Sequence, residues 1–342
     1  MTKSYTFAVA GAQSGHIDGC VGDLLADGHR CKGIFEDDRR AAQTFAEKWK
    51  VPSLASLDEA FAPEVDFIVS AARNDLKIDL IERCEAAGIG IMLDKPAVTG
   101  REGLERLRAV VERSGIAIGL LLSERYRAVI REAKRRIVDG ELGELVSLSL
   151  RKPHRLSPEA RQDWFYAKDQ NGGILLDLFI HDFDLLRFLT GQELVSLHSR
   201  KAKRIMPERA EFYDTASVQA VLEEGIIAQL YTDWHAPRTC WSYGDCRIFI
   251  IGTNGSMELR LTGDPLLEEA GNELLLLATS ERGLHRAEIR AERMSMARDF
   301  VNRLEGGPSL LTNMDIYLAS RASVEADEQA VVYNRFQTDD TE

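Results

Sequence analysis

The chain has 342 residues, with 43 Lys or Arg against 55 Asp or Glu and a net charge of −12. This acidic excess disfavours nucleic acid or an anionic membrane as a partner, because both need basic side chains against phosphate. Hydrophobic residues make up 44% of the chain, enough for a large core, and the length predicts two domains.

The five cysteines are widely spaced and form no C-x-x-C pair. Zinc sites usually bring cysteines in close pairs, so the spacing predicts reduced thiols and no metal site. The apolar runs are strand-sized, too short to span a bilayer, and the first residues lack the apolar run of a signal peptide. We therefore expect a cytoplasmic protein that does not enter a membrane.

The first 122 residues alternate short apolar runs with segments of helical periodicity. Because the apolar runs lack polar alternation, they predict a parallel sheet covered on both faces by helices. The expected fold is a doubly wound α/β domain over residues 1–122. Its strands are expected at 5–10, 31–35, 65–71, 89–93 and 116–122, and its helices at 16–27, 38–50, 76–87 and 102–113.

The pattern changes near residue 123. Consecutive strands with short turns then indicate an open, mostly antiparallel sheet, so residues 123–342 are expected to form an α+β domain. Its strands are expected at 145–150, 194–203, 215–222, 226–234, 247–251 and 256–261, and its helices at 126–139, 172–190, 291–304 and 315–328.

A glycine-bearing turn, Gly11 to Gly15, joins the first strand to the first helix. Such a turn lets a dinucleotide's pyrophosphate meet the N–H groups of a helix start. In the G-x-G-x-x-G pattern Gly11 takes the first position, Gln13 the second and His16 the third. Many strand–helix turns carry two glycines, so the motif alone leaves nucleotide binding open.

Glu36 ends the second strand, 25 residues after Gly11. An acid there can bind the adenine ribose hydroxyls and repels a 2′-phosphate, which favours NAD over NADP. The alternative is that the acidic run caps the helix that begins near Asp38, and Arg39 and Arg40 could tolerate a 2′-phosphate.

Asp94-Lys95-Pro96 directly follows the fourth strand, at the sheet edge where ligands bind in open α/β folds. A lysine there can hydrogen-bond a substrate oxygen and stabilise its developing negative charge. Taken alone, the tripeptide also fits an ordinary surface turn.

The segment 172–184 combines two glycines with acids and a histidine in an otherwise apolar helix. Asp177 and His181 are four residues apart and would share one helix face, with Asp184 three residues further on. Histidine suits general acid/base work near neutral pH. A purely structural Asp–His pair explains the same spacing.

In type and order these segments resemble the Gfo/Idh/MocA oxidoreductases, the family of glucose–fructose oxidoreductase and inositol dehydrogenase. The glycine turn is similar to the family's cofactor loop, and Asp94-Lys95-Pro96 to its E-K-P motif. The segment 172–184 is similar to its G-G-x-x-x-D-x-x-x-H-x-x-D helix, the most specific of the three. The resemblance covers nearly the whole chain. It implies a Rossmann domain followed by a domain whose open sheet forms a homo-oligomer, a dimer or a tetramer.

The resemblance further implies an NAD(P)-dependent oxidoreductase acting on a CH–OH group of a small molecule: a sugar, polyol, inositol or related compound. His181 would be the acid/base, Lys95 would stabilise the reacting oxygen, and Asp177 would orient His181 or substrate. Cofactor contacts are expected from Gly11, Gln13, Ser14, Gly15, His16, Ile17, Glu36, Ala72, Asn74, Lys95 and Pro96, and substrate contacts from Arg125, Tyr126, His154 and Trp164.

Two departures from the family pattern bear on the cofactor. Gln13 replaces the middle glycine, as in a subgroup whose loop carries a histidine after its last glycine. Ala72-Arg73-Asn74 stands for the usual T-P-N, and Lys77 for the histidine that follows, so the nicotinamide side would be contacted differently. The same residues also suit an enzyme that uses bound NAD transiently (a glycosidase, epimerase or lyase) or a non-catalytic NAD sensor.

Overall fold

The computed structural model describes residues 3–267 and 272–337. The chain divides into two compact units. Unit 1 comprises Met1–Ser123, Asp169–Gly172 and Met294–Arg321, and unit 2 comprises Glu124–Lys168, Gly173–Arg293 and Ala322–Glu342. The first change of unit lies beside the predicted boundary, whereas residues 169–172 and 294–321 return to unit 1.

Unit 1 contains a five-stranded parallel sheet in the order β2-β1-β3-β4-β5. The predicted Rossmann arrangement of alternating strands and helices is confirmed. The strands are β1 (Thr6–Ala12), β2 (Arg30–Phe35), β3 (Phe67–Ala71), β4 (Gly90–Leu93) and β5 (Ile118–Leu120), and the helices are α1 (Asp18–Ala26), α2 (Arg39–Trp49), α3 (Leu57–Ala60), α4 (Lys77–Ala87) and α5 (Arg101–Arg113).

The return of the chain to unit 1 depends on an aromatic contact and an amide side chain. Phe300 of α10 (Met296–Leu304) is buried and meets the Phe67 ring edge-on at 5.4 Å between centroids. Asn313, the first residue of α11 (Asn313–Glu328), donates to the Ile116 carbonyl at 2.8 Å and accepts from the Ile118 N–H at 2.9 Å. The predicted helix 291–304 begins only at Met296, where Ser295 caps it.

Unit 2 is built on a nine-stranded sheet in the order β13-β12-β11-β10-β6-β9-β8-β7-β14. It is mostly antiparallel, as predicted, but β6 pairs with β9 and β7 with β14 in parallel. The strands are β6 (Leu145–Pro153), β7 (Leu194–Lys203), β8 (Thr215–Leu222), β9 (Ile227–Asp233), β10 (Arg247–Gly252), β11 (Gly255–Arg260), β12 (Leu274–Thr279), β13 (His285–Arg286) and β14 (Val331–Asn334). The last three were not predicted.

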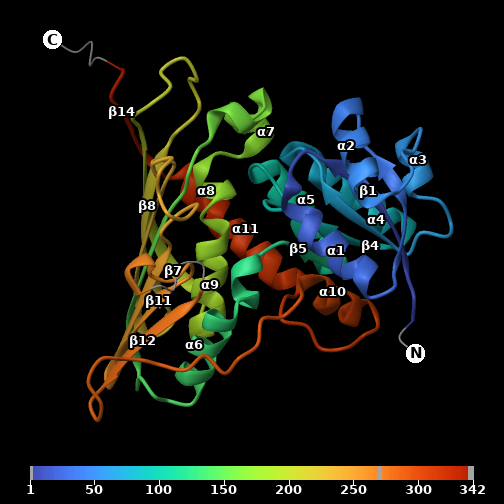
Figure 1. Ribbon diagram of the computed structural model, residues 1–342. Helices are drawn as coiled ribbons and strands as arrows, with labels where there is room; N and C mark the ends of the chain where they lie inside the picture. Colours follow the sequence, from blue (N-terminus) through green and yellow to red (C-terminus); the bar gives the residue numbers. More distant parts are fainter. Residues whose placement is uncertain (1–2, 268–271, 338–342) are drawn as a thin grey trace. The chain divides into compact units, whose positions relative to one another are not determined.

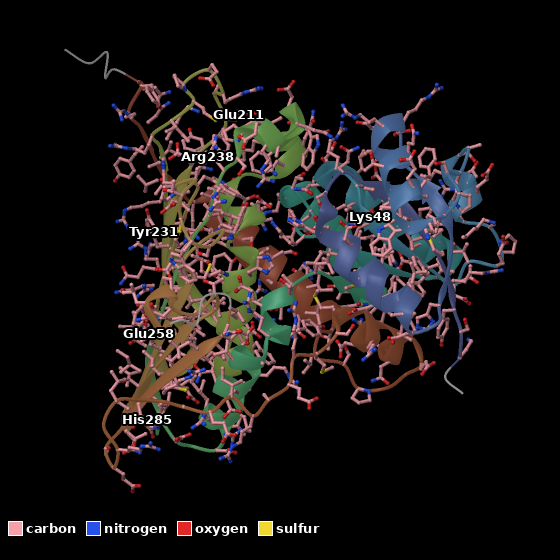
Figure 2. All side chains as sticks on the ribbon, viewed as in Figure 1. Lys48, Glu211, Tyr231, Arg238, Glu258 and His285 are labelled. Atoms are coloured by element: carbon pink, nitrogen blue, oxygen red, sulfur yellow. The ribbon has the colours of Figure 1, made fainter. Side chains whose placement is uncertain are left out.

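Within unit 2, helices α6 (Ala128–Val138), α8 (Ile174–Asp177) and α9 (Ile180–Thr190) lie against one face of this sheet (Figure 1). Alternate residues such as Leu148 and Leu150 point into the core on that face. No described helix of unit 2 covers the opposite face, where Figure 2 labels Tyr231 and Glu258. The sheet is therefore half covered within this chain.

Two further findings concern the sequence expectations about membranes and cysteines. Across residues 3–267 and 272–337, no helix combines the length and the apolar character needed to cross a membrane. All five cysteines are free thiols.

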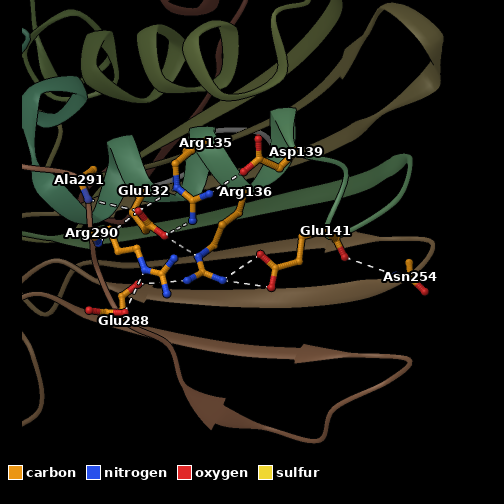
Figure 3. Close-up of polar contacts among 9 residues, drawn as sticks. All are labelled: Glu132, Arg135, Arg136, Asp139, Glu141, Asn254, Glu288, Arg290 and Ala291. Atoms are coloured by element: carbon orange, nitrogen blue, oxygen red, sulfur yellow. Dashed lines mark hydrogen bonds and ion pairs between the residues drawn. The ribbon is translucent and has the colours of Figure 1, made fainter.

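A buried carboxylate, Glu132 of α6, holds the segment that leads out of unit 2 (Figure 3). It accepts hydrogen bonds from Arg135 at 2.6 Å and from Arg136 at 2.8 Å. The backbone N–H groups of Arg290 and Ala291 also donate to it, at 3.3 and 3.2 Å. One desolvated anion thus anchors residues 290–291 to α6, a few residues before the chain enters unit 1.

Glu132→Gln removes one of the two carboxylates that each arginine contacts, since Arg135 also pairs with Asp139 and Arg136 with Glu141. We expect it to lower the free energy of unfolding by about 1–3 kcal/mol at pH 7, the cost of leaving buried hydrogen-bond partners unsatisfied. Burial alone would raise the pKa of Glu132, but the hydrogen bonds and charges of Arg135 and Arg136 lower it to about 2, from an ordinary 4.5. The stabilising contribution is therefore present above pH 4.5 and is lost as pH falls towards 2.

Denaturant unfolding of the wild type and the variant between pH 7 and pH 3 measures this difference. The difference in the free energy of unfolding between wild type and variant should become smaller as the pH falls. A difference that stays constant would contradict a stabilising role of the ionised Glu132 carboxylate. Glu288→Gln is the control, because Glu288 pairs with Arg290 on the surface at a site that is mostly exposed.

Candidate active site

The glycine turn of unit 1 closes tightly against a neighbouring strand end. Gly11 has φ +89°, and a Cβ there would come within 2.5 Å of Ala72, one residue beyond β3. Ser14 caps a short turn of helix, Gly15–Ile17, and α1 follows directly. The chain therefore presents backbone N–H groups at a helix start, the arrangement that suits a pyrophosphate.

The Glu36 carboxylate is held by three donors. The Ala12 N–H donates to Oε2 at 2.8 Å, and the Gln13 side-chain amide and the Asp38 N–H donate to Oε1 at 2.6 and 3.0 Å. Gln13, which stands where the pattern has a glycine, thus contacts the acid predicted to bind ribose. This contact was not predicted, because no sequence signal shows where a glutamine side chain will reach.

Asp94 connects the glycine turn to the turn that carries Lys95. Its buried carboxylate accepts a hydrogen bond from the Ser14 hydroxyl at 2.7 Å and lies 3.0 Å from Nδ1 of His16. Burial alone would raise the pKa of Asp94, but the charges of Lys77 and His16 hold it well below its usual range. Asp94 is therefore a permanent anion that fixes the cofactor loop expected from the sequence.

A fully buried lysine supports the same region. Lys77 donates to the Asn74 side-chain oxygen at 2.8 Å and to the Lys95 carbonyl at 3.2 Å. Asn74, also buried, donates to the Asn171 carbonyl at 2.9 Å. Lys77 was noted only as a departure from the family pattern, and its burial beside the predicted catalytic turn was not foreseen.

In unit 2 the predicted helix 172–190 is interrupted. It forms α8, which ends at Asp177, and α9, which begins at Ile180, so Asp177 and His181 do not lie on one continuous helix. Asp177 is buried and His181 half-buried, in the first turn of α9. The break at 178–179 is local and lies in an apolar run with no glycine or proline to mark it.

Arg125 and Asp184 form a buried ion pair in unit 2. The side chains are 2% and 1% exposed, and Nε of Arg125 donates to the Asp184 carboxylate at 2.9 Å. The guanidinium also stacks 5.0 Å from the Phe188 ring. The charge of Arg125 is thus neutralised within unit 2, and Tyr126 beside it is buried, so a substrate contact for either stays a prediction.

His154 lies in a loop just after β6, and Trp164 in the short 3-10 helix Asp163–Tyr166 of unit 2. The His154 ring meets the Trp234 and Tyr243 rings edge-on, each at 5.6 Å, and its Nδ1 lies 2.7 Å from the Lys152 carbonyl. Trp164 donates to the Gln162 side chain at 3.1 Å. These contacts place both side chains but leave their predicted substrate role untested.

Two family models match the chain. Residues 6–120 match an oxidoreductase family with an NAD-binding Rossmann fold, and residues 130–258 match the GFO/IDH/MocA C-terminal domain. The chain belongs to the Gfo/Idh/MocA family of oxidoreductases. The resemblance drawn from the motifs is confirmed.

Two relatives that the chain resembles are inositol dehydrogenases. The chain is 25% identical over 285 residues to myo-inositol dehydrogenase Hyg17 of Streptomyces leeuwenhoekii, covering 82% of each. It is 26% identical over 273 residues to scyllo-inositol 2-dehydrogenase (NAD(+)) of Bacillus subtilis (strain 168), covering 78% of this chain and 74% of that one.

A solved structure from Erwinia carotovora atroseptica SCRI1043, named as an oxidoreductase, has a TM-score of 0.88 and 26% identity. The match covers 96% of this chain and 99% of that chain. The fold is therefore shared over both units, each with its own sheet.

Gly11→Ala should disrupt the glycine turn, which the sequence predicts to bind the cofactor. An alanine is strained at φ +89°, and its Cβ would collide with the Ala72 backbone. We expect a loss of stability of about 1–3 kcal/mol and at least a tenfold rise in the Kd for NAD. Thermal melts and calorimetric titration measure both.

Gly19→Ala is the matched control, because Gly19 lies in α1 with open space where its Cβ would stand. It should leave NAD affinity unchanged. Equal affinities for the wild type and Gly11→Ala would show that the turn does not contact the nucleotide.

Proposed function

We propose that this oxidoreductase is an NAD-dependent dehydrogenase of a CH–OH group in a sugar, polyol, inositol or related hydroxy compound. The observation that carries the proposal is the Asp94 carboxylate, which binds Ser14 and His16 of the glycine turn directly beside Lys95. The Asp94 carboxylate thus connects the turn that suits a nucleotide with the lysine that suits an oxyanion.

The residues of unit 1 fit NAD. The tight approach at Gly11 and the helix start after Gly15 suit a pyrophosphate, and the anchored Glu36 carboxylate suits two ribose hydroxyls. The negative charge of Glu36 would repel a 2′-phosphate, which favours NAD over NADP. Ala72, Asn74 and Pro96 would border the nicotinamide.

When bound, the nicotinamide supplies a hydride acceptor. His181 would take the hydroxyl proton while the carbinol carbon gives up its hydride to the nicotinamide, so that the alcohol becomes a carbonyl. Lys95 would donate a hydrogen bond to this oxygen and stabilise its alkoxide character. Asp177 would orient His181 or a substrate hydroxyl.

The substrate class draws support from the named relatives, which act on myo-inositol and scyllo-inositol. Both compounds are ring polyols, as the proposal requires. At 25% and 26% identity the likeness supports a polyhydroxy ring and does not choose among such rings.

Lys95→Ala and His181→Ala should each lower kcat/KM at least 100-fold on the best compound of a polyol and sugar panel. NAD affinity should stay within a few-fold in His181→Ala, because His181 is not among the expected cofactor contacts. NADH absorbance, followed in parallel with NAD and NADP, measures activity and cofactor preference, and His285→Ala on β13 is the control. Full activity in both variants would exclude the assignment, and turnover without net NADH would indicate transient redox.

We further propose that the uncovered face of the unit 2 sheet joins copies of this chain in a dimer or tetramer. It carries a groove of about 400 Å³ lined by residues that include Arg151, Tyr231 and Phe249. Apolar side chains around it are exposed, with Ile227 at 45% and Ile251 at 47%. Exposed apolar surface of this kind is typical of a protein interface.

The double change Ile227→Asp and Ile251→Asp would place two charges on this face, one on each side of β6. We expect the oligomer to dissociate to the monomer mass in sedimentation velocity, because unpaired buried charge is costly. Val138→Asp, on the exposed side of α6, is the control and should keep the wild-type mass. A wild type that sediments as a monomer would rule the interface out.

A further inference from the structure

A chain of three buried charges lies at the start of α9 and has no part in the proposed chemistry. Lys152, near the end of β6, is 2% exposed, and its Nζ lies 2.7 Å from Oε2 of Glu124 and 2.6 Å from Oδ1 of Asp182. The Asp182 side chain is 1% exposed and that of Glu124 13%. Three elements, the turn Ser123–Tyr126, β6 and α9, thus meet at one ammonium group.

The charges of this cluster do not balance. One lysine faces two carboxylates, and burial makes each ionised group costly unless it is paired. Burial alone would raise the pKa of Glu124, but Lys152 and His181 lower it to about 2, so Glu124 is ionised. Burial raises the pKa of Asp182 to about 7 although Lys152 is close by. Ionisation is therefore more costly for Asp182 than for Glu124. The cluster thus sets one ammonium group against two carboxyl groups.

His181 lies beside this cluster along α9. It directly precedes Asp182 on α9, and it interacts electrostatically with Glu124. The nearby cations Arg125 and Arg127 are already paired, with Asp184 and with Glu273 at 2.8 Å. Burial raises the pKa of Cys246, next to the cluster, to about 12, so its thiol stays neutral. The charged or titratable groups that act on one another in this cluster are Glu124, Arg127, Lys152, Asp182 and Cys246. Arg125 follows Glu124 directly, and Asp177 and Asp184 lie close to His181 along the chain.

We propose that Glu124, fixed by Lys152, is a positioning residue for His181: its carboxylate favours the imidazolium that forms when His181 takes the substrate proton. This inference rests on the proposed role of His181. Glu124 does not touch the reacting atoms. It sets the proton affinity of the group that does, through a negative charge held in a low-dielectric setting.

The test is the titration of the His181 imidazole, followed by NMR in full-length protein with labelled histidine. The seven histidines are few enough to resolve, and His181→Gln identifies the signal. Glu124→Gln should lower the pKa of His181 by about one unit, because a nearby negative charge is lost. Glu124→Asp should stay closer to the wild type, because it keeps the charge. Glu141→Gln is the control, since Glu141 pairs with Arg136 elsewhere in unit 2.

The pH dependence of kcat/KM tests whether Glu124 affects His181 during the reaction. If His181 must be unprotonated to accept the proton, the acidic limb of kcat/KM for alcohol oxidation should move down by the same amount in Glu124→Gln, with little change in KM. A merely structural role would lower activity without moving this limb. Should Glu124→Gln fail to fold, Asp182→Asn tests the same electrostatics and should also lower the pKa of His181.

The outcomes separate this inference from the proposed function. An unchanged pKa of His181 in folded Glu124→Gln, or a shift equal to that of Glu141→Gln, overturns the inference even if the enzyme is a dehydrogenase. A lowered pKa in a protein that oxidises no compound of the panel supports the electrostatic role and rejects the proposed function.

Discussion

The carboxylate of Asp94 is the interaction on which the arrangement of unit 1 depends. It follows β4, while Ser14 and His16 follow β1, and β3 lies between these strands in the sheet. Because the strands are parallel, their carboxyl ends meet at one edge, and a short side chain there can reach across. A buried anion is stable only while its donors stay in place, so the glycine turn cannot leave Asp94 without a large desolvation cost.

Unit 2 is also held by buried ion pairs, but here the central group of each is a cation and not a carboxylate. Arg125 pairs with Asp184, and Lys152 with Glu124 and Asp182, so two buried cations bracket the start of α9. Buried pairs of this kind contribute little net stability compared with well-packed apolar side chains. Their effect is to fix the orientation and the local electric field of the first two turns of α9, which carry His181.

Local signals made much of this fold predictable. The strand and helix alternation of residues 1–122 follows from periods that are visible in short windows, and Asp94, Lys95 and Glu36 could be placed at strand ends for that reason. The features that the sequence did not predict depend on contacts between residues far apart in the chain. The return of α10 to unit 1 depends on Phe300 reaching Phe67, and the parallel pairing of β6 with β9 depends on topology. The break between α8 and α9 has no residue that marks it.

Net charge was the least informative part of the sequence for the site, and the buried lysines show why. A charge of −12 describes the balance of the whole chain, but the field at a given atom comes from the few groups that water does not screen. Lys77 and Lys152 are almost completely buried, each close to carboxylates that are themselves buried. A lysine is placed there only by the fold that surrounds it, and composition treats it like any exposed lysine. An acidic chain can therefore bury individual cations, each neutralised by neighbouring carboxylates, without any sign of this in its net charge.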